Sequence, residues 1–135
     1  MRIALATAIA AAIATAANLA IQELGRSVLA VPPDFEPYHG TVAPYTIGGV
    51  ALAGIAYWLV RRFTVNARRN YLWLSALALV LSWIPDVALY VLHDPGATIP
   101  AVGSLMVMHT VAAVVVVALL LAIAPAARHA ITTRW

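Results

Sequence analysis

Four long stretches of the chain are almost wholly apolar, and short segments with polar residues and helix breakers separate them. The apolar stretches cover residues 3–24, 44–60, 71–92 and 101–124. Each approaches the roughly 20 apolar residues that a helix needs to cross about 30 Å of hydrocarbon. The separating segments contain Pro32-Pro33, Arg61-Arg62 and Asp94-Pro95-Gly96. The pattern predicts an all-α, antiparallel four-helix bundle that spans a membrane, with residues 1–135 forming one transmembrane domain.

The first stretch has a second interpretation, as a cleaved signal peptide. Met1-Arg2 precedes an Ala-rich run, and Ala14-Thr15-Ala16 would serve as a cleavage site. The apolar run continues past that site to Leu24, which is longer than a signal peptide requires. We therefore expect a retained helix.

Composition supports a membrane protein and removes several other classes. Hydrophobic residues make up 64% of the chain and charged residues 10%, whereas about a quarter of an average soluble domain is charged. Disordered chains combine low hydrophobicity with high net charge. The absence of cysteine excludes disulfides, thiolate metal sites and cysteine nucleophiles. The sequence shows no phosphate loop, zinc motif or haem attachment motif, so we expect no metal, no cofactor and no nucleic-acid partner.

The placement of charges predicts how the chain is oriented. All eight basic residues are arginine, and seven of them fall on one side of a four-crossing topology, with Arg26 on the other. The five acidic residues lie in the opposite half. Because arginine-rich loops stay in the cytoplasm, both termini and the loop 61–70 are expected there. The chain is then a multi-pass protein of the cytoplasmic (inner) membrane, in contact with the lipid bilayer.

A few polar side chains interrupt the apolar spans at similar depths. At about 1.5 Å of rise per residue, Asn18, Asp86 and His109 lie roughly 9–12 Å from the outer ends of their helices. Ionisable groups inside a membrane are costly and usually face a bundle interior or a cavity. Helical spacing places Gln22 near the face of Asn18 and Ser82 on that of Asp86. We predict that Asn18, Gln22, Ser82, Asp86 and His109 line an outward-facing polar pocket.

Proline and small residues give further expectations about packing. Pro85 removes the backbone hydrogen bond to the carbonyl of Leu81 and should kink the third helix, with Ser82 or water as the replacement partner. Small residues that recur every four positions let membrane helices approach closely. Such series occur at Ala8, Ala12, Ala16 and Ala20 and at Gly49 and Ala53.

The outer loop 26–43 combines charged residues with prolines and aromatic residues. Asp34, Glu36 and His39 lie in it, but their spacing fits no specific metal motif. We expect a loop that caps the mouth of the bundle through its apolar and aromatic side chains. Arg26 is expected to pair with one of the acids.

Three short motifs resemble a known family. They are Asn18 late in the first span, the Ser82-Trp83-Ile84-Pro85-Asp86 run in the third, and the Met108-His109 step in the fourth. They resemble a bacterial family of small four-helix integral membrane proteins that is catalogued as a domain of unknown function. The resemblance covers nearly the whole chain and implies a single four-crossing domain. It implies no activity, substrate or cofactor.

Three functions are compatible with these residues. The working hypothesis is a non-enzymatic protein that binds or passes a small molecule, a lipid or a proton at the polar pocket. The main alternative is an accessory or structural subunit of a larger membrane complex, or a homo-oligomer, in which the polar residues only fix the register of the helices. The third is an intramembrane enzyme that uses Asp86 and His109 as an acid–base pair, although no nucleophile turn or oxyanion hole accompanies them.

Overall fold

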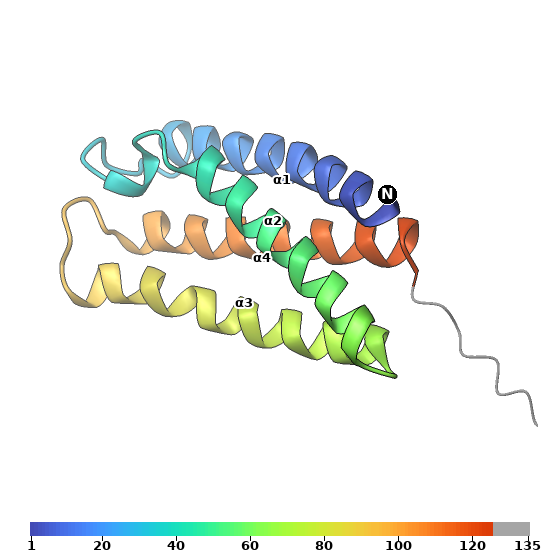
Figure 1. Cartoon of the computed structure of the whole chain (residues 1–135). Helices are drawn as coiled ribbons and strands as arrows, with labels where there is room; N and C mark the ends of the chain where they lie inside the picture. Colours follow the sequence, from blue (N-terminus) through green and yellow to red (C-terminus); the bar gives the residue numbers. More distant parts are fainter. Residues whose placement is uncertain (126–135) are drawn as a thin grey trace, which may run out of the picture.

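The computed structural model describes residues 1–125 and contains four long helices and one short 3-10 helix (Figure 1). The elements are α1 (Arg2–Ser27), η1 (Glu36–Tyr38), α2 (Val42–Phe63), α3 (Ala67–Val91) and α4 (Ile99–Ile123). All four α-helices are long and apolar enough to cross a membrane. The predicted all-α membrane bundle is confirmed, and the protein is a small multi-pass membrane protein. Arg128 and Arg134, which contribute to the predicted charge bias, lie outside the described residues.

The helices extend past most of the predicted apolar boundaries, chiefly where arginine lies at their ends. α2 continues through Arg61 and Arg62 to Phe63, and α3 begins at Ala67, so that Arg68 and Arg69 lie in its first turn. Hydropathy detects only the part of a helix that suits lipid. The backbone hydrogen bonds continue beyond it, because a long arginine side chain can carry its charge back to the membrane surface.

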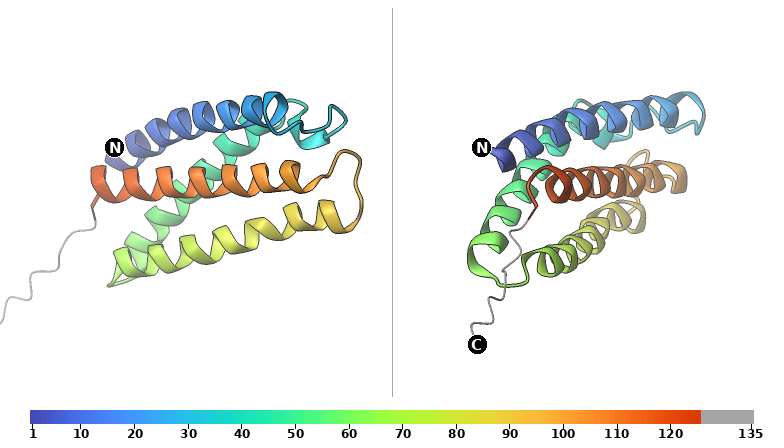
Figure 2. Two further views of the ribbon diagram at one scale, coloured as in Figure 1. Left: turned by 180° about the vertical axis from the view of Figure 1, so that it is seen from behind. Right: turned by 90° about the vertical axis from the view of Figure 1, so that its right-hand side faces the viewer.

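Three of the helices form a layer, and the fourth crosses it. α4 packs against both α1 and α3, while α2 packs mainly against α1 (Figures 1 and 2). α2 runs diagonally from α1 at one end of the bundle to α3 at the other (Figure 1). We call the end that holds η1 and the α3–α4 turn the acidic end. The opposite end, with residue 2 and the α2–α3 turn, is the arginine end.

Alanine residues of α1 line its contact with α4. Ala6, Ala10 and Ala14 on α1 are fully buried in one apolar cluster that includes Val116 and Leu120 of α4. The predicted series on α1 is instead exposed; its members are Ala8, Ala12, Ala16 and Ala20. The prediction had the right spacing and the wrong phase, because the helix carries alanine on several faces. Gly49, predicted at a helix contact, is also exposed, and the close approach on α2 is made by Gly54 against Thr7.

Hydrogen bonds tie α2 to its neighbours at the arginine end. The Tyr57 hydroxyl donates to the carbonyl of Ala124 at 2.7 Å, and Arg61 Nη1 donates to the same oxygen at 3.0 Å. The Tyr71 hydroxyl donates to the carbonyl of Ala53 at 3.3 Å, and the rings of Tyr57 and Tyr71 lie 4.7 Å apart. The contacts of Tyr71 hold α2 and α3 together at this end, and the bonds to Ala124 hold α2 to the end of α4. From here α2 and α3 diverge toward the acidic end (Figure 1).

Candidate binding cavity

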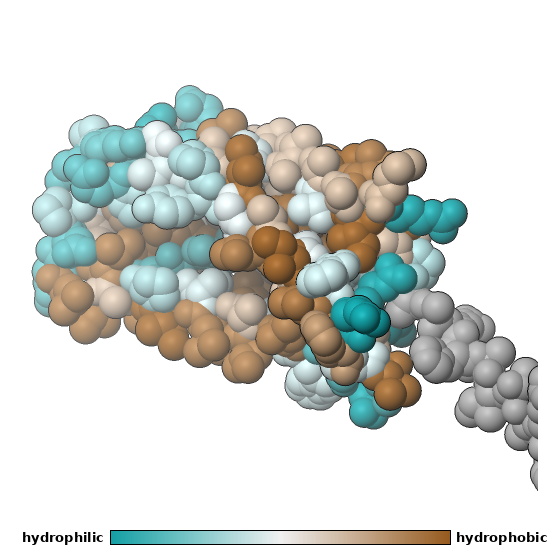
Figure 3. All heavy atoms as spheres, viewed as in Figure 1, coloured by the Kyte–Doolittle hydropathy of each residue, from teal (hydrophilic) through white to brown (hydrophobic). Residues whose placement is uncertain are grey.

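A cavity of about 980 Å³ lies where α2 and α3 diverge. α4 contributes residues between Leu105 and Val117 to its lining, and α1 contributes Asn18. Figure 3 shows the hollow on the flank of the bundle between α2 and α3, with hydrophilic atoms set among hydrophobic ones. The flank of a membrane-spanning bundle faces lipid, so a hollow on this flank faces the bilayer.

Asp86 and His109 meet inside this cavity. His109 Nε2 lies 3.4 Å from Asp86 Oδ2, across the contact between α3 and α4. The Asp86 side chain is only 7% exposed, whereas that of His109 is 44% exposed. The contact is within ion-pair distance, but Oδ2 of Asp86 accepts no hydrogen bond from residues 1–125. The predicted meeting of these two residues is confirmed, and the carboxyl group keeps unused hydrogen-bonding capacity.

Asn18 is the residue of α1 that lines the cavity. Its Nδ2 donates to the hydroxyl of Thr46 at 2.9 Å, and that hydroxyl donates to the carbonyl of Val42 at 2.7 Å. Asn18 is 3% exposed, and its Oδ1 has no hydrogen-bond partner in the described part of the chain. The amide nitrogen therefore joins α1 to α2, while the amide oxygen has unused hydrogen-bonding capacity.

Ser82 also lines the cavity, but not in the predicted role. Its hydroxyl donates to the carbonyl of Leu79 at 2.7 Å, not to that of Leu81. Pro85 lies inside α3 without interrupting it. The prediction that the Ser82 hydroxyl bonds the carbonyl of Leu81 is therefore wrong. The hydroxyl instead bonds a carbonyl in the preceding turn of its own helix.

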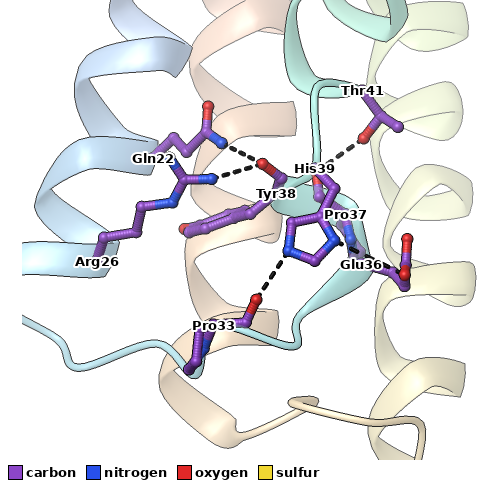
Figure 4. Close-up of polar contacts among 8 residues, drawn as sticks. All are labelled: Gln22, Arg26, Pro33, Glu36, Pro37, Tyr38, His39 and Thr41. Carbon is purple, nitrogen blue, oxygen red and sulfur yellow. Dashed lines mark hydrogen bonds and ion pairs between the residues drawn. The ribbon is translucent and has the colours of Figure 1, made fainter.

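Gln22 does not line the cavity. Its Nε2 donates to the backbone carbonyl of Tyr38 at 2.7 Å, and Arg26 Nη2 donates to the same oxygen at 2.7 Å (Figure 4). The prediction that Gln22 belongs to the pocket is wrong. The segment around η1 folds over α1 at this level and takes up the amide that would otherwise have faced the interior.

The segment 28–41 forms the cap that the sequence predicts. Phe35 and Tyr38 are buried with their rings 5.3 Å apart in an edge-to-face arrangement. The Tyr38 hydroxyl shares a hydrogen bond with Ser104 of α4 at 2.6 Å. Gly25 leaves room for this ring, since a Cβ there would collide with the Tyr38 hydroxyl. Arg26 bonds the Tyr38 carbonyl and lies over its ring, at 5.6 Å, where an acidic partner was expected.

Comparison with known proteins adds the family. A model described as a family of unknown function, DUF6069, matches residues 1–126. The chain belongs to the DUF6069 family. This confirms the resemblance to a family of unknown function drawn from Asn18, the Ser82–Asp86 run and the Met108-His109 step. No curated protein and no solved structure matches the chain.

The acidic and histidine residues of the loops of this DUF6069 protein do not gather into one cluster. His39 Nδ1 lies 3.7 Å from Glu36 Oε1, and the other ring nitrogen of His39 contacts the carbonyl of Pro33 at 2.8 Å (Figure 4). Asp34, His93 and Asp94 line a separate, shallow depression beside Tyr90. Within residues 1–125, no group of three such side chains is placed to hold a metal ion.

Two features of the DUF6069 cavity escaped prediction. Gly48 and Gly49 both line it, and a Cβ at either position would meet no atom within 4 Å. Consecutive glycines in a membrane span are the signal that could have indicated missing side-chain volume. Glu36 lines the mouth at the acidic end. Its sequence position, far from the apolar spans, gave no such indication.

Proposed function

We propose that this protein binds a small amphipathic molecule or lipid, without catalysis, in the cavity between α2 and α3. One observation carries the proposal. Asn18 and Asp86 both line the cavity, each is at least 95% buried, and each has an oxygen without a hydrogen-bond partner in residues 1–125. Leaving a buried acceptor unsatisfied costs about 1–3 kcal/mol. A ligand that donates hydrogen bonds at this level would remove that cost.

The size and lining of the cavity also support a ligand. Pockets that hold small molecules usually measure about 300–1,000 Å³ and have apolar walls with a few convergent polar groups. Here the walls include Val50, Leu74, Leu79 and Val116, and the polar groups are gathered near Asp86. An apolar tail would pack along the walls while a polar head reaches the carboxyl group. Because the flank is open, such a molecule can enter from the bilayer.

We also propose that the protein lies in the cytoplasmic membrane with both termini in the cytoplasm and with Asp86 and Asn18 of the cavity in the outer half. Among the described residues, Arg2 and the four arginines of 61–69 lie at the arginine end, and Arg26 alone lies at the other. Glu23, Asp34, Glu36 and Asp94 are at the acidic end. Positive charge is retained on the cytoplasmic side during insertion.

The orientation is tested with reporters. Alkaline phosphatase inserted after Gly40 should be active, and a fluorescent protein fused after Trp135 should be bright, because the first folds outside the cytoplasm and the second inside. The reciprocal pair of fusions serves as the control. An active phosphatase at position 135 with an inactive one at position 40 would contradict the orientation.

Filling the cavity tests the proposed binding. Gly49→Leu adds a side chain to the cavity lining at a position where a Cβ meets no atom within 4 Å, and it gains helix propensity. We expect the variant to be as stable as the wild type. The fraction of protein that carries a co-purifying amphiphile should fall at least tenfold, as measured by native mass spectrometry after release from membranes. The loss follows because leucine occupies the volume that the ligand needs.

Gly103→Leu is the matched control. Gly103 lies on α4, has open space at its Cβ position and does not line the cavity. This variant should keep the wild-type occupancy. If wild type, Gly49→Leu and Gly103→Leu carry the same bound molecules, or if none carries any, the cavity is not a binding site. The polar residues would then serve only to hold the helices of a structural or accessory subunit in register.

A further inference from the structure

The chemistry of the cavity narrows the class of ligand, and this step rests on the proposed function. Four buried side-chain atoms have no hydrogen-bond partner within residues 1–125, and two of them, Asn18 Oδ1 and Asp86 Oδ2, belong to residues that line the cavity. Both are oxygens. The amide oxygen can only accept hydrogen bonds, and an ionised carboxylate likewise only accepts. A ligand that fits this level must therefore bring donors. A hydroxyl group brings one O–H donor, whereas a protonated primary amine brings three N–H donors.

The charges around the cavity point the same way. Two carboxyl groups line it, Asp86 inside and Glu36 at the mouth, and its lining contains no arginine. The chain has no lysine. His109 is the one histidine in the lining. His39 lies outside it, with its Nδ1 atom 3.7 Å from Glu36 Oε1. A carboxylate or phosphate head would therefore meet like charge, with only the histidines to oppose it.

The apolar walls set the remainder of the molecule. From Asp86 the cavity continues along Leu79, Ala78 and Leu74 of α3 to Tyr71, with Ala53 and Ala56 of α2 opposite. Within the lining, this part carries polar atoms only at Ser75 and Tyr71. An alkyl chain suits it, and the open flank admits such a chain from lipid. This part of the lining has too few hydrogen-bonding side chains to bind a sugar or a nucleotide.

We propose that the cavity binds a single-chain amphiphile whose head is a protonated primary amine. The ammonium group lies at Asp86, where it donates to Oδ2 and neutralises the carboxylate. Asn18 Oδ1 accepts a further hydrogen bond from the head or from water that the head retains. The alkyl chain extends between α2 and α3 toward Tyr71. His109 remains beside Asp86 and sets the position of the carboxyl group.

The test compares heads on one chain length. The protein in phosphatidylcholine nanodiscs is photolabelled with a diazirine-bearing dodecylamine, and the label is competed with dodecylamine, dodecanol or dodecanoate. Labelling of Gly49→Leu gives the background from the bilayer. Dodecylamine should compete at a mole fraction about tenfold below that of dodecanol, because hydrogen bonds to a charged group are the stronger ones. Dodecanoate should be the weakest competitor.

Two matched pairs of variants locate the head. Asp86→Asn keeps the size of the side chain and should remove the advantage of the amine over the alcohol, whereas Asp94→Asn, outside the cavity, should retain it. Glu36→Gln should weaken amine binding less than Asp86→Asn, and Glu23→Gln should leave it unchanged. Thermal unfolding of each variant confirms that it is folded.

The outcomes separate this inference from the function on which it rests. If dodecanol or dodecanoate competes as well as dodecylamine, or if Asp86→Asn keeps the preference, the amine assignment is wrong and the cavity remains a binding site. If none of the three competes and labelling equals that of Gly49→Leu, the proposed binding function fails together with it.

Discussion

Replacing His109 with leucine is expected to destabilise the bundle by about 2–3 kcal/mol, since it removes the side chain that lies at ion-pair distance from the buried carboxyl group of Asp86. Asp86 is 5% exposed and has His109 Nε2 at 3.4 Å, with no hydrogen bond from residues 1–125 to its Oδ2. Leucine leaves the carboxyl group against apolar walls. Because His109 is 44% exposed, the expected value lies below the roughly 3–5 kcal/mol that breaking a fully buried pair costs. Chemical unfolding in detergent micelles measures the loss.

The double variant shows whether the effect comes from the stranded carboxyl group. Asp86→Asn alone should cost less than about 1 kcal/mol, because asparagine keeps size and hydrogen bonding while it removes the charge. In the His109→Leu/Asp86→Asn variant most of the lost stability should return, so that the two changes are strongly non-additive. Additive effects, or a His109→Leu variant as stable as the wild type, would show that the two side chains do not act as a pair.

Replacing Tyr38 with alanine is expected to cost about 3 kcal/mol, as deletion of a buried aromatic ring usually does. The ring is buried against Phe35, its hydroxyl bonds Ser104 at 2.6 Å, and Arg26 lies over its face. The loss should release the cap from α1 and α4. Protease sensitivity of the segment 28–41 should rise together with the loss of thermal stability.

Two companion variants calibrate the Tyr38 result. Tyr38→Phe removes only the hydroxyl and should cost about 1 kcal/mol, the usual net value of one hydrogen bond. Tyr90→Ala removes a ring that is 46% exposed on α3 and should change stability little. A Tyr38→Ala variant that is no less stable than Tyr90→Ala would mean that the cap rests on the bundle without supporting it.

The helices and the depth of the polar residues could be predicted because lipid imposes simple rules. A span must be apolar over its crossing length, so 71–92 was found as a helix even though α3 begins at Ala67. Ionisable side chains in such spans turn inward. That rule, with helix rise, placed Asp86 and His109 at one level, and the structure brings them within 3.4 Å.

The remaining features depend on tertiary contacts that leave little trace in the sequence. An alanine-rich helix such as α1 offers several small faces, and packing against α4 selects the one with Ala10. Gln22 shares the face of Asn18 but lies one turn nearer the acidic end, where Tyr38 takes its amide. The divergence of α2 from α3 follows from contacts at Tyr57 and Tyr71. A cavity forms where side chains are missing, and the sequence indicates this only through the Gly48-Gly49 pair.

The most direct measurement of the binding cavity is the pattern of labelling along α4 by a membrane-partitioned, uncharged alkyl diazirine. Ala112, Ala113 and Val117 face the cavity, whereas Val107 and Val114 are exposed on α4 away from it. If alkyl chains enter between α2 and α3, peptide mapping should find label at 112, 113 and 117 in the wild type. That label should be lost in Gly49→Leu while labelling at 107 and 114 persists. Label confined to 107 and 114 in the wild type would show that lipid chains stay outside the bundle, and would contradict the proposed function.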